Sequence, residues 1–552
     1  MQSRLAAIGF FASTALVLAF AISCGGDPND PLTWVAKLDR GAERSDAIEK
    51  VREIFRNELN KNDGNYDAPS VKALAAKLAP GIIAAATKYK DDRENTRKML
   101  QVLAELRDRR AIPVFIAALD FIPDVSEDEA CAGAEGLGLL KAREGIQPMI
   151  KALERITGNR AGDNRMKRAI VEAFGRIGDP AAVPAMITLI DKPAEEQDFF
   201  INKLATVALG KLGDASAVPA LIRALYMQGR GATIFQQARV SLAQVGPAAV
   251  PDIIKAMRRQ DTDLNKMAKA LDFDGMNPGI LEDKCERILA DLGDPSAIDA
   301  LIEMLGGGNR QAVGDEEKVW LPPVRGFAAI ALARLARDEA QINRVIEAIL
   351  PLASELPQSA HSDLYRALAS TGQARTHEFL AKRMMDRRVY GEVVRFWASD
   401  WLAHWGNKGV KAQIANFFAG EPAGVLTELE ADVTRIRAKS EVSEECDQNV
   451  ACWVGKLEQA NLGGQAADRL GLLAMQGNEE ARTALMAKVD HQDLEVRRAI
   501  LENVARAHPQ GCDPCIARLE AVVVAEEGRT RLAVSHNDIH VIASRFRHAK
   551  NR

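Results

Sequence analysis

Residues 174–184 read Phe-Gly-Arg-Ile-Gly-Asp-Pro-Ala-Ala-Val-Pro, and residues 209–219 repeat them as Leu-Gly-Lys-Leu-Gly-Asp-Ala-Ser-Ala-Val-Pro. Related versions of this phrase occupy residues 103–113, 242–251 and 289–298. The aliphatic residue near the end of the phrase recurs at steps of 34, 37, 35, 32 and 48 residues, at Ile112, Ile146, Val183, Val218, Val250 and Ile298. A period in the thirties with two helical patterns per unit indicates a stack of helix pairs.

The phrase has the chemistry of a turn between two helices. Gly178 can adopt the left-handed conformation that ends a helix, Asp179 can cap the next one, and Pro180 suits a first helical position. After the turn, apolar residues at positions i, i+3, i+4 and i+7 form one stripe, made of Val218, Leu221, Ile222 and Leu225. Two such helices cannot cover their own apolar faces, so neighbouring units must stack.

The composition agrees with an all-α body. The chain has 552 residues, of which 47% are hydrophobic, 27% charged and only 5% aromatic, and it is rich in Ala and Leu. A length that would otherwise suggest several domains of about 150 residues is explained by internal repeats. The formal net charge of −4 gives no support for a nucleic-acid partner, which usually requires a basic surface.

At this point the sequence resembles the HEAT family, in the variant found in phycobilin lyases. A Val-Arg pair that this family places at the start of the second helix of a repeat occurs at 324–325, 394–395 and 496–497. The resemblance covers most of residues 31–552 and implies a curved α-solenoid of about eleven or twelve two-helix repeats. It implies little about function, because such repeats serve as scaffolds, carriers and occasionally enzymes.

The N-terminus has the features of an export signal. Arg4 precedes an apolar run over residues 5–22, which is followed by Ser23 and Cys24. Residues 21–24, Ala-Ile-Ser-Cys, resemble the lipobox of bacterial lipoproteins, in which the signal peptide is cleaved before a cysteine that is acylated. We therefore expect a signal peptide over 1–23 and a lipid-bearing Cys24. The alternative is a permanent membrane helix, for which an apolar run of about 18 residues is barely long enough.

Residues 24–30 would then form a short lipidated tether. Gly25 after the lipidated cysteine favours the outer membrane over the inner membrane, because the resemblance to lipoproteins makes Asp at that place the retention signal. No later segment reads as a membrane span, since Pro80 and Gly81 interrupt the apolar stretch at 78–87. The expected location is the cell envelope, with the periplasmic side and the surface both open.

Two insertions interrupt the repeats, at 258–280 and at 306–323. We place both between the first and second helix of successive repeats, so they should emerge side by side on one edge. Insertions of this kind often mark a binding face. The large apolar residues Trp320, Phe273 and Met276 lie in them, and are either a lid over the helix ends or a contact surface for a protein partner.

Four of the seven cysteines fall in close pairs, and an exported protein meets oxidising conditions. Cys446 and Cys452 can form a disulfide only if Cys446 lies in a loop and Cys452 lies in the first turn of the helix that follows it. Cys512 and Cys515 have the spacing of either a structural disulfide or a redox motif, and His508 could join them in a zinc site.

Cys131 and Cys285 lie on second helices about four repeats apart, too far to be bridged, and are expected to be buried thiols. Trp397, Trp401 and Trp405 form a stripe on one helix face, which is either core or a binding platform.

The functional hypothesis is a non-catalytic protein-interaction scaffold without a cofactor. The sequence contains neither a Gly-x-Ser-x-Gly motif nor a phosphate-binding glycine loop. The alternative is an envelope thiol-redox or metal accessory protein that uses Cys512, Cys515 and His508.

Overall fold

The computed structural model describes residues 27, 29–122, 125–193, 196–229, 231–273, 279–307, 317–355, 361–528 and 531–549, and for 317–323 and 355 it describes only the backbone. The chain forms two compact units, Met1–Leu212 and Gly213–Arg552, each of which is taken by itself below.

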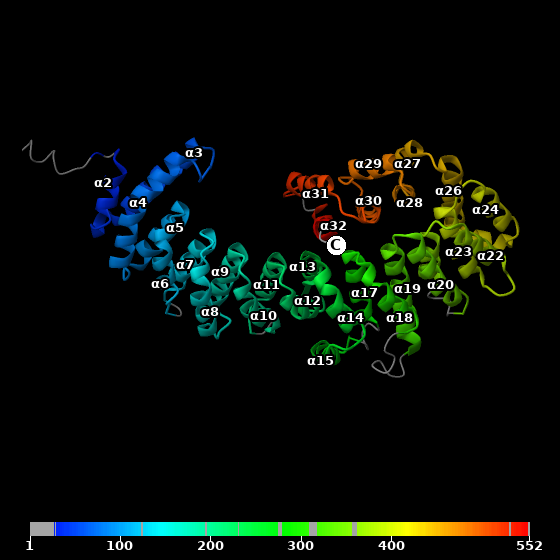
Figure 1. The fold of residues 1–552 in the computed structure, drawn as a ribbon, viewed down its shortest axis with the longest axis horizontal. Coiled ribbons are helices and arrows are strands. Elements are labelled where there is room, and N and C mark those ends of the chain that lie inside the picture. Colours follow the sequence, from blue (N-terminus) through cyan, green and yellow to red (C-terminus); the bar gives the residue numbers. More distant parts are fainter. Residues whose placement is uncertain are drawn as a thin grey trace, which may run out of the picture. The chain divides into compact units, whose positions relative to one another are not determined.

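The first unit consists of helices joined by short turns (Figure 1). Its α-helices are α2 Pro31–Lys37, α3 Arg44–Lys61, α4 Pro69–Lys88, α5 Arg93–Leu106, α6 Ile112–Ala118, α7 Glu127–Leu139, α8 Ile146–Arg155, α9 Ala161–Ile177, α10 Val183–Asp191 and α11 Phe199–Leu212. Its 3-10 turns are η1 Gly41–Glu43, η2 Arg109–Ala111, η3 Arg143–Gly145 and η4 Pro180–Ala182. From α5 onward, a longer helix is followed by a shorter one.

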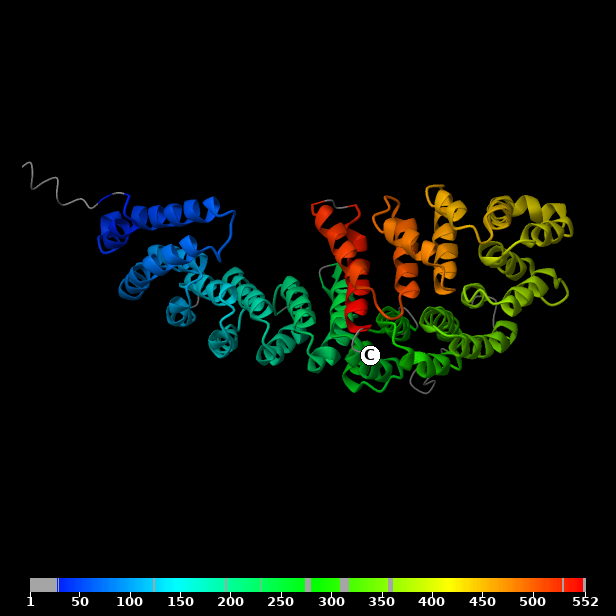
Figure 2. The same cartoon turned by 45° about the horizontal axis from the view of Figure 1, so that its top comes forward.

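The second unit continues the same pattern (Figure 2). It contains η5 Ala215–Ala217, α12 Val218–Ala224, α13 Phe235–Val245, η6 Gly246–Ala249, α14 Val250–Met257, α15 Thr262–Ala270, α17 Ile280–Leu292, η7 Pro295–Ala297, α18 Ile298–Leu305, α19 Glu317–Leu335, α20 Glu339–Glu355, α21 His361–Ala369 and α22 Ala374–Met385. It ends with α23 Glu392–Trp405, α24 Val410–Ala419, α25 Ala423–Glu428, α26 Glu430–Cys446, α27 Val450–Lys456, α28 Gly463–Met475, α29 Glu479–Ala487, α30 Leu494–Ala507, α31 Asp513–Ala525, η11 Ala533–Ser535 and α32 His536–Ala549.

The predicted all-α solenoid of helix pairs is confirmed. In the described parts of the chain, sheet is limited to one hairpin of two-residue strands, β1 Gln228–Gly229 and β2 Ala232–Thr233. On the first helix of a pair, the inward positions are apolar at helical spacing. On α9, for example, Met166, Ile170 and Phe174 are each fully buried.

The repeated turn forms as its residues predict. Gly178 ends α9 in the left-handed conformation with φ +73°, and the Asp179 carboxylate accepts a hydrogen bond from the Ala181 N–H at 2.9 Å. Asp179 therefore caps a single 3-10 turn that starts at Pro180, and this turn leads directly into the second helix at Val183.

Helix α4 runs unbroken through Pro80 and Gly81, where the sequence predicted an interruption. Proline lacks the N–H that would bond the carbonyl group four residues earlier. Arg110 Nη2 donates to this Ala76 carbonyl oxygen at 2.8 Å and replaces the missing donor. At Gly81 the absence of a side chain lets α2 approach, since a Cβ there would lie 2.1 Å from Val35 Cγ1.

Among the helices that the structure describes, α4 is the one whose length and composition would allow it to cross a membrane. Its apolar side chains Val71, Leu78 and Ile82 are buried within the first unit, as in the core helix of a packed repeat. The prediction that no segment after the signal peptide has membrane-span composition is therefore wrong for α4, and burial explains the apolar sequence.

The arginine of each Val-Arg pair is buried and holds its repeat together. Arg497 pairs with Glu526 at the end of α31, through bonds of 3.1 and 3.0 Å, and Arg395 forms the same two-pronged pair with Glu421 after α24. Arg325 donates from Nε to the Leu305 carbonyl oxygen at 2.7 Å. A guanidinium group with several donors can thus tie one helix to the end of a neighbouring helix.

Both insertions connect the short helix that follows a repeated turn to the next long helix. Residues 258–280 connect α14 to α17 and contain the short helix α15, whereas 306–323 connect α18 to α19.

Candidate functional site

The second unit folds back on itself. In Figures 1 and 2 the C-terminal helix α32 lies beside α13 and α17, near the start of the unit, and the three helices are in contact. Arg239 on α13 donates to Asp538 on α32 at 2.5 Å, and His548 contacts the Gln244 carbonyl oxygen at 2.8 Å. Contacts in this unit therefore extend beyond neighbouring repeats.

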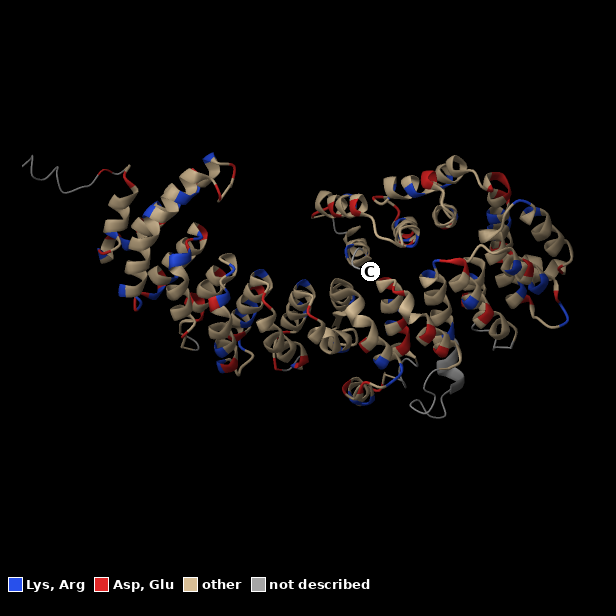
Figure 3. Cartoon of the chain, in the orientation of Figure 1, with Lys and Arg blue, Asp and Glu red and all other residues tan. Residues whose placement is uncertain are grey.

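Ion pairs also join other helices of the second unit that meet where it folds back. Arg334 on α19 forms a two-pronged pair with Glu502 on α30, at 2.7 and 2.6 Å. Arg239 is also paired with Asp291 on α17, with distances of 2.5 and 3.1 Å. Lys and Arg are interspersed with Asp and Glu along the helices of both units (Figure 3), so ion pairs are available where helix faces meet.

A cavity of about 410 Å³ lies between α13, α17, α19, α30 and α32. This volume falls in the range of small-ligand sites. Apolar side chains such as Leu501, Ala505 and Ile542 form part of its wall. The polar part of the wall contains more arginines than carboxylates, and includes Arg239, Arg334, Arg506, Arg545, Asp291 and Glu502. A more open cleft of about 640 Å³ shares Glu502 and Arg498 with it.

Arg506 lines the same cavity, but its hydrogen-bond acceptors are neutral groups, whereas those of Arg239 and Arg334 include carboxylates. Its side chain is 92% buried, because the residue is only 8% exposed. It donates to the Ser370 carbonyl oxygen at 3.3 Å and to Asn503 Oδ1 at 3.5 Å, and its Nε has no partner. Burial lowers the pKa of Arg506, and the charges of Glu502 and Asp468 only partly oppose this effect.

A buried His–Asp pair lies next to Arg506. His404 Nε2 lies 2.9 Å from Asp468 Oδ2, and the other oxygen of Asp468 accepts from Asn503 at 2.8 Å. Burial lowers the pKa of His404, so the ring is neutral near pH 7. Burial alone would raise the pKa of Asp468, but the hydrogen bonds from His404 and Asn503 lower it. Asp468 is thus an anion bonded to neutral groups.

The tryptophan stripe on α23 is packed in the second unit. Trp405 is buried, with 2% exposure, whereas Trp397 and Trp401 are partly buried. Trp401 lies between charged groups, with the Arg366 guanidinium 5.6 Å and the Lys439 ammonium 5.7 Å from its ring centre. The stripe therefore serves core packing rather than forming an exposed platform.

The structure contains disulfides at both cysteine pairs. The Cα atoms of Cys446 and Cys452 are 5.3 Å apart. Cys446 is the last residue of α26 and not part of a loop, as the sequence suggested, because the chain turns sharply at Asp447, directly after it. Cys452 lies in the first turn of α27, where its N–H donates to Asn449 Oδ1 at 3.0 Å. Asn449 therefore caps α27 and fixes the short loop that the disulfide closes.

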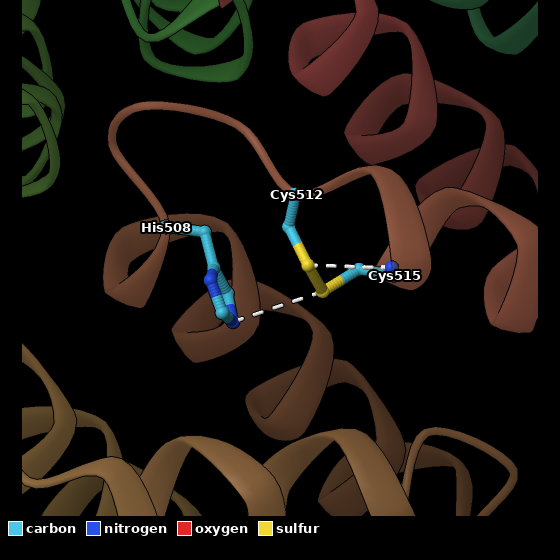
Figure 4. A group of neighbouring side chains, drawn as sticks. All are labelled: His508, Cys512 and Cys515. Carbon is cyan, nitrogen blue, oxygen red and sulfur yellow. Dashed lines mark hydrogen bonds between the residues drawn. A yellow bond between two sulfur atoms is a disulfide. The ribbon is translucent and has the colours of Figure 1, made fainter.

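Cys512 and Cys515 are also joined, with Cα atoms 5.2 Å apart, and His508 Nε2 lies 3.9 Å from Cys515 Sγ (Figure 4). These three residues are close enough together to hold a metal ion. Metal ligation and thiol chemistry both require a thiolate, and the disulfide holds both sulfur atoms. The redox or metal interpretation is therefore not favoured.

Of the cysteines that the structure describes, Cys131 and Cys285 are free thiols. Cys285 is fully buried and Cys131 is partly buried. Burial raises the pKa of Cys131 to about 11 and that of Cys285 to about 12. Both thiols are thus protonated at neutral pH and poor nucleophiles.

The proposed contact residues of the insertions have different outcomes. Phe273 is 7% exposed and packs on Tyr226, with ring centroids 5.9 Å apart, so its assignment to a partner surface is wrong. Met276 lies outside the described residues. Trp320 belongs to α19 rather than to a loop, and its side chain is outside the description. Cys24 also lies outside the described residues.

The cavity itself was not predicted. In the structure, residues 541–546 at the end of α32 are all buried. One face of an amphipathic helix cannot bury six consecutive residues, so this helix must be covered on more than one side.

Comparisons with known proteins agree with the repeat architecture. The model of the PBS lyase HEAT-like repeat matches residues 166–192 and 204–226. A search of the curated proteins found no match.

Similar solved structures include Kap121p bound to Pho4p, with 11% identity and a TM-score of 0.46, over 92% of this chain and 57% of that one. They also include importin beta, with 14% identity, a TM-score of 0.30, and 95% and 74% coverage. A third is the UNC-45 chaperone, with 13% identity, a TM-score of 0.22, and 97% and 76% coverage. The chain thus spans little more than half the length of Kap121p. The repeat match and the paired helices support a HEAT-repeat protein.

Proposed function

We propose that this chain is a non-catalytic protein-interaction scaffold that a lipid on Cys24 tethers to a bacterial cell envelope, at the outer membrane. The observation that carries the scaffold function is the succession of helix pairs through both units. Each pair adds an outward surface to that of its neighbour, and repeat proteins use such extended surfaces to bind partners. Trp320 and Met276 stay among the proposed contact residues.

The start of the folded body supports a short tether. Helix α2 begins at Pro31, where the Asp30 carboxylate accepts from the Leu32 N–H at 3.2 Å and pairs with Lys77 at 2.9 Å. Only the residues between Cys24 and Asp30 would then separate the lipid from the first helix. Six extended residues span about 20 Å, so the first unit would lie close to the membrane surface.

Replacing Cys24 by serine is expected to abolish acylation and to release the protein from membranes, because no other cysteine lies in the lipobox-like segment. Intact-mass measurement and membrane fractionation check this result. Cys131→Ser is the matched control, since Cys131 is a free thiol within the first unit. A mature wild-type protein without acyl chains would contradict the anchor.

A cluster of exposed apolar side chains gives a place to test the scaffold function. Around the turn from α22 to α23, Met385 is 43%, Val389 66% and Val393 47% exposed. Single exposed apolar residues are ordinary, but three within nine residues are typical of a protein contact.

Val389→Asp is expected to reduce the yield of crosslinked partner recovered from native membranes, and to change the unfolding free energy by less than about 0.5 kcal/mol. Val524→Asp is the control, because Val524 is 70% exposed on another repeat. An unchanged set of crosslinked proteins with Val389→Asp would exclude this turn as the contact. The absence of any specific crosslinked protein would contradict the scaffold function itself.

A further inference from the structure

The cavity between α13, α17, α19, α30 and α32 is closed by elements from both ends of the second unit. A cavity built in this way exists only in the folded-back form of the unit. Its wall combines buried guanidinium groups with aliphatic side chains, which are the two kinds of surface that recognise opposite parts of an amphipathic molecule.

Four of its arginines are already paired with carboxylates, two of them within their own helices, where Arg287 pairs with Asp283 and Arg498 with Glu495. Arg239 is bonded to Asp291 and Asp538, and Nε and Nη2 of Arg334 both donate to Glu502. A guanidinium group in such a pair has little capacity left for a ligand. The ion pairs of Arg239 and Arg334 hold together the helices around the cavity and are not the groups that would bind a ligand.

Arg506 is the guanidinium that stays available. Its two bonds go to neutral oxygens at 3.3 and 3.5 Å, which is long for a charged donor, and the buried Nε bonds to nothing. The two nearest carboxylates are engaged elsewhere, Glu502 with Arg334 and Asp468 with His404 and Asn503. A buried charge that makes no ion pair is costly, so an anion at this place would be stabilising.

We propose that this cavity binds a small organic monocarboxylate with an apolar body. The carboxylate accepts hydrogen bonds from the Arg506 guanidinium, and the apolar body lies against Leu501, Ala505 and Ile542. One guanidinium without an ion pair matches one negative charge. The aliphatic wall would favour a hydrocarbon chain over a fully hydrated anion such as inorganic phosphate.

Calorimetric titration of the purified full-length chain tests the proposal with four probes. Hexanoate is expected to bind, whereas hexanol, which has the chain without the charge, should bind about tenfold more weakly or not at all. Hexylamine and inorganic phosphate should give no saturable signal. Equal binding of hexanoate and hexanol, phosphate binding as tight as that of hexanoate, or no hexanoate binding would each overturn the proposal.

Arg506→Met locates the site. Methionine fills similar space without a charge, so the variant should weaken hexanoate binding at least about tenfold and should not lower the thermal midpoint of the ligand-free chain. Arg547→Met is the control, because Arg547 lies on α32 and pairs with Glu520 at the surface. Unchanged hexanoate binding by Arg506→Met would overturn the assignment.

A second variant keeps the test valid if Arg506→Met does not fold. Val534 lines the cavity and is 49% exposed, so a substitution there leaves the core intact. Val534→Glu places a carboxylate at the rim and should weaken hexanoate binding by repulsion, an effect that 1 M salt would reduce. Hexanoate binding by Val534→Glu that equals wild type at low salt would count against the cavity as the site.

Discussion

The Glu526→Ala variant should unfold with a free energy about 3–5 kcal/mol below that of the wild type. The Arg497 side chain that pairs with Glu526 has 0% exposure, and the bond lengths are 3.1 and 3.0 Å. Removal of the carboxylate leaves a buried guanidinium without its counter-charge. Five of the six tryptophans lie in the second unit, so urea denaturation followed by tryptophan fluorescence reports mainly on this unit.

Two further variants separate loss of the ion pair from loss of packing. Arg518→Ala breaks a pair with Asp490 whose side chains are 43% and 47% exposed, and should change the free energy by less than about 1 kcal/mol. The double variant Arg497→Met with Glu526→Leu should recover most of the loss, because an apolar pair leaves no buried charge. A Glu526→Ala loss no larger than that of Arg518→Ala would contradict the role of the pair.

The pH dependence gives an independent check. Burial alone would raise the pKa of Glu526, but the hydrogen bonds from Arg497 and His536 lower it below the value in the unfolded chain, which is about 4.3. The stability from this lowered pKa is fully present above that value and is lost as the pH falls through the pKa of the folded state. The gap between wild type and Glu526→Ala should therefore narrow below about pH 4.

The helix pairs could be predicted from sequence because their information is local. Gly178, Asp179 and Pro180 each have a conformational preference that acts within a few residues, and the apolar stripe needs only helical spacing. The same reasoning failed at Pro80, because the donor that compensates the proline comes from Arg110, thirty residues later. Local patterns cannot show a compensating contact of this kind.

The candidate cavity was missed for a related reason. Arg239 and Asp538 are 299 residues apart, and neither lies in a sequence motif that would indicate its ion-pair partner. In the sequence Arg506 reads as an ordinary charge in the last turn of a helix, where a basic residue is favoured. Only the fold shows that its side chain is buried. The burial of residues 541–546 on α32 implies a second packing face, but it does not indicate which helix supplies it.

In the insertions, the expectation of an exposed apolar residue was wrong for Phe273, which packs in the core instead. Phe273 lies beside Gly275 and Gly279 in a stretch without repeat pattern, which favoured an exposed loop. The structure packs Phe273 against Tyr226, whose hydroxyl donates to the Leu281 carbonyl oxygen at 2.8 Å. An aromatic residue in an irregular segment can thus be a core residue of the neighbouring repeat.

Arg239→Met should detach α32 from the start of the second unit. Burial opposes the charged form of Arg239, but Asp291 and Asp538 hold its pKa above the usual value. With methionine in its place, these two carboxylates lose their shared cation while they remain partly buried, at 16% and 22% exposure. A loss of about 3 kcal/mol is expected from such a broken pair, which corresponds to roughly 100-fold faster amide exchange in α32.

Hydrogen exchange measured by mass spectrometry can locate this change, since α32, α13 and α17 should lose protection while the first unit does not. Arg547→Met changes an exposed arginine on the same helix and should leave protection unchanged. Adding Asp291→Asn and Asp538→Asn to Arg239→Met should restore part of the protection, because neutral amides do not repel each other. Full protection of α32 in Arg239→Met would show that apolar contacts, such as those of the fully buried Phe546, hold the unit closed without the ion pairs.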